Sequence, residues 1–294
     1  MRVPVDRRPL VAGDADPGPR ARRRPQRGGG TERVGVRGAR QGERGDGESG
    51  ERDETSRGEQ GDYAGARIAF ERALEFSREL GAEAREAAAI GNLATLAHYE
   101  ARYSDALVFY ERALELYRKH GATSNELITI ENIGNSAILT GDVDAAIARF
   151  RAATELAREA GATWELTNAL RWLARALILR GEVAEPARLL DEAVDATARI
   201  GYGRALAETL EIVAELKGDE AAAARLLGAA DGIRERVGVA QFPDNAVFVE
   251  RRSAELQAAL GARYDKEHKS GRGLSVDEAV ALAHAAIASR DVGE

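Results

Sequence analysis

Residues 61–76 read GDYAGARIAFERALEF, and residues 101–116 read ARYSDALVFYERALEL. The pattern returns at 141–156 as GDVDAAIARFRAATEL and at 181–196 as GEVAEPARLLDEAVDA. These four stretches begin at positions 61, 101, 141 and 181, which are 40 residues apart, and a fifth copy begins 37 residues later at Gly218. Self-similarity at a fixed period indicates a protein built from stacked structural repeats.

Each repeat reads as two helices. In the quoted stretches, apolar and small side chains recur at i, i+4, i+7 and i+8, which gives a helix one buried stripe. A glycine follows the last turn of these helices, as at Gly161 and Gly201, and it suits the left-handed residue just past a helix end. One helical hairpin cannot bury its stripe alone, whereas stacked hairpins share a continuous core.

The first helix of each repeat carries its own recurring set. Its members are Ile90, Leu93, Ala94 and Ala97, then Ile130, Ile133, Gly134 and Ala137, then Leu170, Leu173, Ala174 and Leu177. Over residues 61–237 the whole pattern resembles the tetratricopeptide repeat family. The resemblance implies an all-α fold, namely a right-handed α-α superhelix (a TPR-like solenoid). The usual period of the family is about 34 residues, so a period of 40 predicts longer helices.

Residues 1–60 differ sharply from the repeats. They hold 12 of the 31 glycines, five of the seven prolines and almost no large apolar residues. Such a segment cannot bury enough surface to offset its ordering entropy, so we expect a disordered Arg/Gly-rich segment here. Its 14 Arg and 11 acidic residues give a net charge of +3, whereas the remainder carries −10. The acidic repeat region argues against direct binding of nucleic acid.

Residues 238–294 are predicted to form a C-terminal helical cap. A break at Phe242-Pro243-Asp244-Asn245 precedes a helix from about residue 246 to 260. The sequence SVDE at 275–278 reads as a capping box that opens a last helix.

A second resemblance lies in the C-terminal strings ARLLGAA at 224–230 and LSVDEAVALA at 274–283. They are similar to the ends of actinobacterial LuxR-type regulators and signalling ATPases. In those proteins a nucleotide-binding module precedes the repeats, and many also carry a DNA-binding helix-turn-helix. This chain has no phosphate-binding Gly-x-x-x-x-Gly-Lys-Ser/Thr sequence.

The sequence offers no chemistry-bearing constellation. The chain has no cysteine, its four histidines (98, 120, 268 and 284) are scattered, and no Gly-x-Ser-x-Gly elbow occurs. We therefore expect no enzymatic activity, no catalytic residues, no metal site and no cofactor. No run of about 18 apolar residues occurs, so we expect no membrane partner and a cytoplasmic location.

The candidate binding residues follow from the resemblance to tetratricopeptide repeats. In that family the first helices line a concave groove, and an Asn near the Leu-Gly position often faces bound peptide. Equivalent positions of successive repeats form two rows. The first row holds Asn92, Asn132 and Trp172, and the second row, three residues later in each repeat, holds Thr95, Asn135 and Arg175. Arg171, which precedes Trp172, is a further candidate. The alternative is that Trp172 fills the core and the Asn side chains join neighbouring helices.

Two functions remain open. One is a scaffold that binds a peptide or partner protein in the groove. The other is the sensor arm of a transcriptional regulator or signalling ATPase, which acts on a nucleotide-binding or DNA-binding module in trans.

Overall fold

The computed structural model describes residues 63–201, 203–241 and 243–289. Within these ranges the regular structure is helical and no strand occurs, which confirms the predicted all-α class. The predicted disordered segment, residues 1–60, lies outside the described residues. No helix in the described part of the chain has both the length and the apolar character that a membrane crossing requires.

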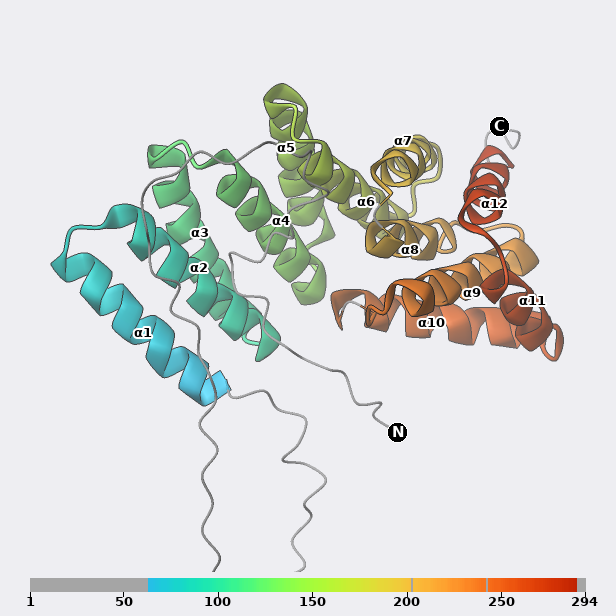
Figure 1. Cartoon of the computed structure of the whole chain (residues 1–294), viewed down its shortest axis with the longest axis horizontal. Helices are drawn as coiled ribbons and strands as arrows, with labels where there is room; N and C mark the ends of the chain where they lie inside the picture. The colour runs from blue at the N-terminus through green and yellow to red at the C-terminus, as the bar shows by residue number, and fades with distance from the viewer. Residues whose placement is uncertain (1–62, 202, 242, 290–294) are drawn as a thin grey trace, which may run out of the picture.

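The helices form a solenoid in which each of the first nine packs against the next (Figure 1). The helices in the described residues are α1 (Tyr63–Glu79), α2 (Glu83–Tyr99), α3 (Tyr103–Lys119), α4 (Thr123–Thr140), α5 (Val143–Ala160), α6 (Thr163–Arg180), α7 (Ala184–Ile200), α8 (Gly203–Val213), α9 (Glu220–Val237), α10 (Pro243–Leu260), α11 (Arg263–Arg272) and α12 (Val276–Ala288). The even-numbered helices α2, α4, α6 and α8 are the first helices of successive repeats, and the helix after each is the second.

Local signals in the sequence set the ends of these helices. Gly161 and Gly201 end α5 and α7 with φ of 64° and 69°, as predicted for a left-handed terminal residue. The Asp142 side chain begins α5 by accepting a hydrogen bond of 3.1 Å from the backbone N–H of Ala145. Short turns of this kind reverse the direction of the chain, so consecutive helices pack side by side.

Large side chains of the second helices fill the space between layers. Tyr110 on α3 and Phe150 on α5 are buried, whereas Phe70, at the equivalent position of α1, is only half-buried. The difference has a simple cause: α3 and α5 each pack between two first helices, whereas α1 packs mainly against α2. Burial of an aromatic ring of this size stabilises a fold by about 1.5–3 kcal/mol.

The last three helices pack on the end of the stack. The predicted helix at 246–260 corresponds to α10, and the predicted capping box is present, with Ser275 and Glu278 exchanging hydrogen bonds at the start of α12. Helix α11 was not predicted. Its backbone approaches α9 so closely that a Cβ added at Gly228 would lie 1.9 Å from the carbonyl oxygen of His268. Helix α12 packs against α7, α8 and α9.

Candidate functional site

The predicted site residues lie on α2, α4 and α6, which are neighbours in the stack because α2 packs against α4 and α4 against α6. Two rows run across these helices at equivalent heights. We call these residues the inner face: Asn92, Thr95, Asn132, Asn135, Trp172 and Arg175. Arg171 lies on α6, one turn before Arg175, and completes the predicted set.

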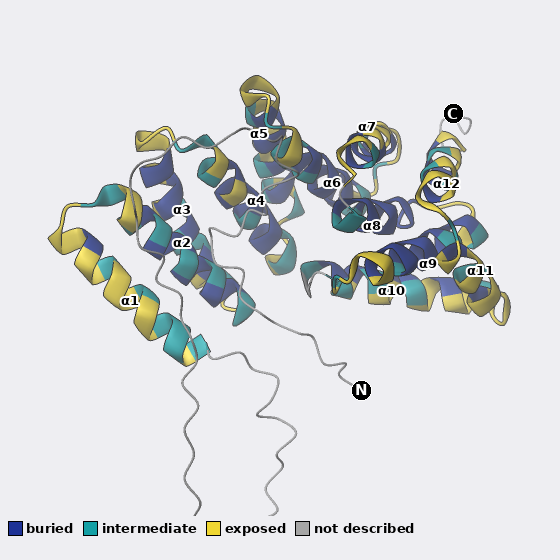
Figure 2. Ribbon diagram, viewed as in Figure 1, coloured by how far each residue is buried: buried dark blue, intermediate teal, exposed yellow. Residues whose placement is uncertain are grey.

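Exposure falls steadily along the inner face. On α2 and α4, Asn92, Thr95 and Asn132 are half-buried. Farther along, Asn135 is 6% exposed, Trp172 8% and Arg175 0%. Figure 2 shows the same trend, with α6 and α8 buried over most of their length. Because these positions are equivalent in successive repeats, the difference must come from what covers them.

Arg175 is held from every side. Its guanidinium donates two hydrogen bonds to Oε1 of Glu215, from Nε at 2.9 Å and from Nη2 at 2.6 Å. Nη1 donates a third to Oδ1 of Asn245 at 2.6 Å. The guanidinium carbon also lies 5.1 Å from the Trp172 ring centroid and 4.4 Å from that of Phe248, within cation–π range. In this arrangement Arg175 has no face left for an external ligand.

Arg171 is buried as well and binds within the stack. It donates from Nη1 to Oε2 of Glu208 at 2.6 Å and from Nη2 to Oδ1 of Asn168 at 2.6 Å. A third hydrogen bond, of 3.3 Å, goes to the backbone carbonyl of Ala205 on α8. Charge-assisted hydrogen bonds of this kind join α6 to α8. In this arrangement the Arg171 side chain therefore joins two neighbouring first helices.

Trp172 contributes to the core beneath the inner face. Its ring stacks on Phe150 with centroids 6.2 Å apart and an interplanar angle of 13°. Phe248 of α10 belongs to the same buried apolar cluster. The Arg175 guanidinium carbon also lies 5.1 Å from the centroid of the Trp172 ring, so Trp172 is a core side chain in this arrangement.

Helix α10 is the element that covers this half of the inner face. Its first turn reaches from the end of the stack to α2, where Oδ1 of Asp244 lies 3.4 Å from Nε2 of His98. The other ring nitrogen of His98 lies 2.9 Å from the hydroxyl oxygen of Ser136 on α4. Asn245 and Phe248 then bind Arg175, as described above. The first half of α10 thus contacts side chains of α2, α6 and α8.

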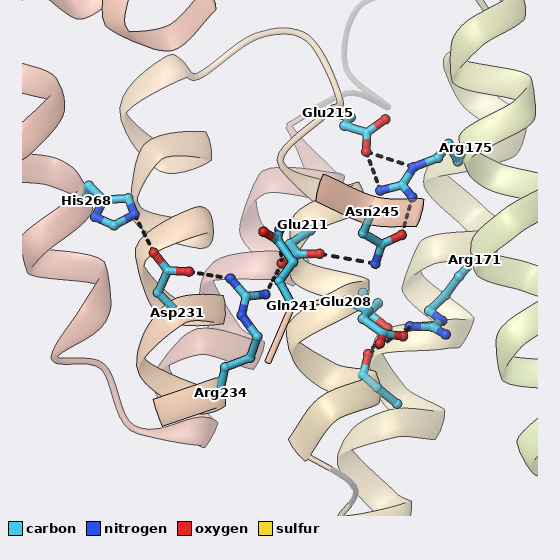
Figure 3. A network of polar contacts seen from close by, with 12 residues as sticks. Arg171, Arg175, Glu208, Glu211, Glu215, Asp231, Arg234, Gln241, Asn245 and His268 are labelled. Atoms are coloured by element: carbon cyan, nitrogen blue, oxygen red, sulfur yellow. Dashed lines mark hydrogen bonds and ion pairs between the residues drawn. The ribbon is translucent and has the colours of Figure 1, made fainter. Parts of the chain in front are cut away.

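Figure 3 shows that Asn245 joins two ion-paired clusters. Its Nδ2 donates to Oε2 of Glu211 at 3.2 Å, while its Oδ1 accepts from Arg175. Oε1 of Glu211 is paired with Arg234 on α9 and accepts a further hydrogen bond from Gln241 at 3.2 Å. The network continues from Arg234 to Asp231 and from there to His268 on α11, at 3.1 Å. It therefore connects α6, α8, α9, α10 and α11.

Burial dominates the electrostatics of this network. Burial raises the pKa of Glu211, although the adjacent charge of Arg234 acts in the opposite direction. Burial would also raise the pKa of Asp231, but the hydrogen bond from His268 and the charge of Arg234 together lower it. The two carboxyl groups thus differ in acidity even though both contact Arg234.

Glu131 on α4 is a further buried carboxyl group whose pKa is raised. Burial raises its pKa from 4.5 to about 8, against the attraction of Arg171 and with the repulsion of Glu165. Its Oε1 atom is buried and has no hydrogen-bond partner among the described residues. At neutral pH the side chain is therefore predominantly protonated and uncharged.

The sequence contained a signal for the carboxyl groups that the prediction missed. Continuing by the 40-residue period from Arg171 and Arg175 leads to Glu211 on α8 and to Glu215 just after it. Going back by the same step from Arg171 leads to Glu131. Acidic and basic residues thus alternate at one position of successive repeats. No comparable signal pointed to Asn245, which lies outside the repeats.

The described residues of the inner face carry polar side chains and form no metal site. They contain no group of three or more His, Asp, Glu or Cys placed to hold a metal ion. The half-buried amides and hydroxyl of α2 and α4 can donate and accept hydrogen bonds. The buried polar network of α6 and α8 fixes the stack on which these side chains stand.

Comparison with known proteins identifies the type of fold. Residues 56–119 match the family described as Tetratricopeptide repeat, and repeats of this family generally mediate protein–protein interactions. In a search of curated protein sequences, none matches the chain. Among solved structures, BtubC (BKLC) from P. vanneervenii is similar in fold, with a TM-score of 0.54 and 14% sequence identity over 80% of this chain and 94% of that one. The fold is therefore a helical solenoid of the tetratricopeptide type, an architecture that typically serves as a scaffold.

Proposed function

We propose that this protein is a non-catalytic scaffold that binds a peptide or a partner protein on the inner face of its repeats. The observation that carries the proposal is the half of that face on α2 and α4, where Asn92, Thr95 and Asn132 are half-buried at equivalent positions of the repeats. Side-chain amides at such a spacing can hydrogen-bond the backbone of an extended segment. The preformed stack limits the entropy that binding must offset.

The charge of the repeat region favours one class of partner. Residues 61–294 carry a net charge of −10, obtained by subtracting the +3 of residues 1–60 from the total of −7. A partner segment with positive or mixed charge is therefore attracted to the scaffold, and a strongly acidic one is repelled. The binding contacts themselves are neutral amides, so the charge acts mainly on the rate of association.

The test is affinity capture with the full chain from a lysate of the source cells, followed by mass spectrometry. Three baits are compared: the unchanged chain, Asn132→Ala on the inner face, and Gln257→Ala, which removes an exposed amide from the outside of α10. We expect a partner that is retained by the unchanged chain and by Gln257→Ala but is lost with Asn132→Ala. If Asn132→Ala retains every partner, binding does not use the inner face.

The same experiment separates the scaffold from the regulatory arm suggested by the C-terminal strings. A regulatory arm should capture a nucleotide-binding or DNA-binding module. A scaffold of the kind proposed should capture a partner whose binding segment can be reduced to a short peptide. The domain limits proposed for such work are 61–237 for the repeats and 238–294 for the C-terminal helices.

A further inference from the structure

Helix α10 buries an unusual stripe of side chains. Asn245, Phe248, Arg252 and Leu256 are its buried residues, and they follow one another at intervals of three or four along one side of the helix. Two of the four are polar or charged. Most of the remaining side chains of α10 whose burial is described are exposed, as Figure 2 shows, and Val247 is 60% exposed. Helix α10 is therefore attached through polar contacts of Asn245 and Arg252 as well as through apolar contacts of Phe248 and Leu256.

These polar contacts fit the inner face group by group. Asp244 faces His98, and the amide of Asn245 lies between a guanidinium and a carboxylate, with its oxygen toward Arg175 and its nitrogen toward Glu211. A carboxylate at position 245 would be repelled by Glu211, and an ammonium group would be repelled by Arg175. An amide satisfies both neighbours because it carries an acceptor and a donor.

The repeats beside α10 contain buried polar atoms that have no hydrogen-bond partner among the described residues. They are Oε1 of Glu131 and Oδ1 of Asn135 on α4, Nε of Arg171 on α6, and Oε2 of Glu215 just after α8. Of these residues, Glu215 binds Arg175, which α10 contacts directly. Buried polar groups without partners oppose the arrangement that buries them. A better-matched occupant would bind the same surface more favourably.

We infer that α10 is an intramolecular occupant of the binding surface, and that a partner helix with the same side-chain pattern displaces it. This inference rests on the proposed function and adds to it the chemistry of the partner. The partner presents a carboxylate, an amide at the next position and an aromatic ring three positions after the amide, the arrangement of Asp244, Asn245 and Phe248. Such a helix reproduces the contacts to His98, Arg175 and Trp172 and competes with α10 for them.

The geometry also explains how displacement would extend the binding surface. The half of the inner face on α2 and α4 holds the half-buried Asn92 and Asn132, and release of α10 would add Arg175. The Arg175 guanidinium would lose its contacts to Asn245 and Phe248 and could then bind a carboxylate or an amide oxygen. A partner that binds first at α2 and α4 would be placed beside α10 and could replace it.

The experiment uses a labelled synthetic peptide of residues 243–260 as the probe and the full chain as the receptor. Binding is measured by fluorescence anisotropy to the unchanged chain, to Asn245→Ala/Phe248→Ala and to the matched control Val247→Ala, which changes an exposed residue of the same helix. We expect the double variant to bind the peptide about tenfold or more tightly than the other two, because apparent affinity falls with the fraction of molecules whose site is covered. A peptide carrying the same two substitutions should bind none of them.

If the peptide binds the unchanged chain and both variants equally, or binds none of these three proteins, α10 is a fixed part of the fold. If the double variant fails to fold by circular dichroism, amide hydrogen exchange of the unchanged chain decides. We expect α10 amides to exchange about tenfold or more faster than those of α6 and α9, as an element that opens locally does. Equal protection of the three helices would overturn the inference. Loss of partner capture with Asn132→Ala is unaffected by either result, so the proposed function is tested separately.

Discussion

Replacing Arg175 by alanine tests how the covered part of the inner face is stabilised. The side chain of Arg175 is wholly buried, and the side chain of its partner Glu215 is only 4% exposed. The substitution removes two charge-assisted hydrogen bonds to Glu215 and one to Asn245, and it leaves a carboxylate buried without its counter-charge. Breaking a buried ion pair in this way destabilises a fold by about 3–5 kcal/mol.

This loss should be visible in thermal unfolding followed by far-ultraviolet circular dichroism. For a chain of this size each kcal/mol shifts the midpoint by about 2–4 °C, so we expect Arg175→Ala to lower it by about 6–20 °C. The matched control is Arg151→Ala, which breaks the half-exposed ion pair with Glu185. Such a surface pair contributes about 0–1 kcal/mol, so its midpoint should fall by no more than about 4 °C.

A second substitution identifies the cause of the loss. Glu215→Gln in the Arg175→Ala background removes the unpaired charge while keeping the shape of the side chain, so it should restore part of the lost stability. If the double variant is no more stable than Arg175→Ala alone, the unpaired carboxylate is not the cause. If Arg175→Ala costs no more than Arg151→Ala, the description of Arg175 as a buried structural residue is wrong.

Three further predictions concern other parts of the fold. The pKa of Glu131 in the folded protein is raised to about 8, so the native state retains a proton that the unfolded state releases. The free energy of unfolding should therefore fall as pH rises from 5 to 8, and Glu131→Gln should lack this dependence. Over that range the difference in unfolding free energy between the two proteins, measured in urea, should change by up to about 4 kcal/mol, and parallel pH profiles of the two proteins would contradict this prediction. Gly228→Ala should destabilise the fold by about 1–3 kcal/mol or more, because the added Cβ would meet the backbone of His268. In the control Gly273→Ala the nearest atom to the added Cβ is 3.7 Å away, so the urea midpoint should change little. Ser275→Ala removes the capping box of α12 and should cost about 1 kcal/mol, seen as faster amide exchange in the first turn of that helix and not in α6.

The repeats could be predicted from the sequence because their signals are local or periodic. The spacing of Tyr110 and Phe150 identified the side chains that fill the layers, and both are buried. Gly161 and Gly201 marked helix ends, and both adopt positive φ. Helix α11 escaped prediction because its residues are almost entirely polar, so it shows no apolar period; it is held by the close approach of its backbone to Gly228.

The state of the inner face could not be predicted in the same way. The 40-residue period makes the row positions of α4 and α6, which include Asn132 and Arg175, equivalent in sequence. Equivalent positions are equally exposed only where neighbouring repeats have the same surroundings. At α6 the surroundings differ because α10 packs against Arg175. The contact between His98 and Asp244 joins residues 146 positions apart, and it depends on the direction in which the chain leaves α9, for which no periodic signal exists.

The alternation of charge along the first helices links the fold to the proposed function. Glu131, Arg171 and Glu211 occupy one position of three successive repeats, and in a stack of identical repeats such a position would carry one charge throughout. Because Glu131 is predominantly protonated at neutral pH, the attraction between layers is made at Arg171, which pairs with the neighbouring Glu208 and joins α6 to α8. One turn later on α6, the Arg175 guanidinium lies on one side of Asn245, and the Glu211 carboxyl group lies on the other. The surface is therefore selective for an amide at that point, whether the amide comes from α10 or from a partner.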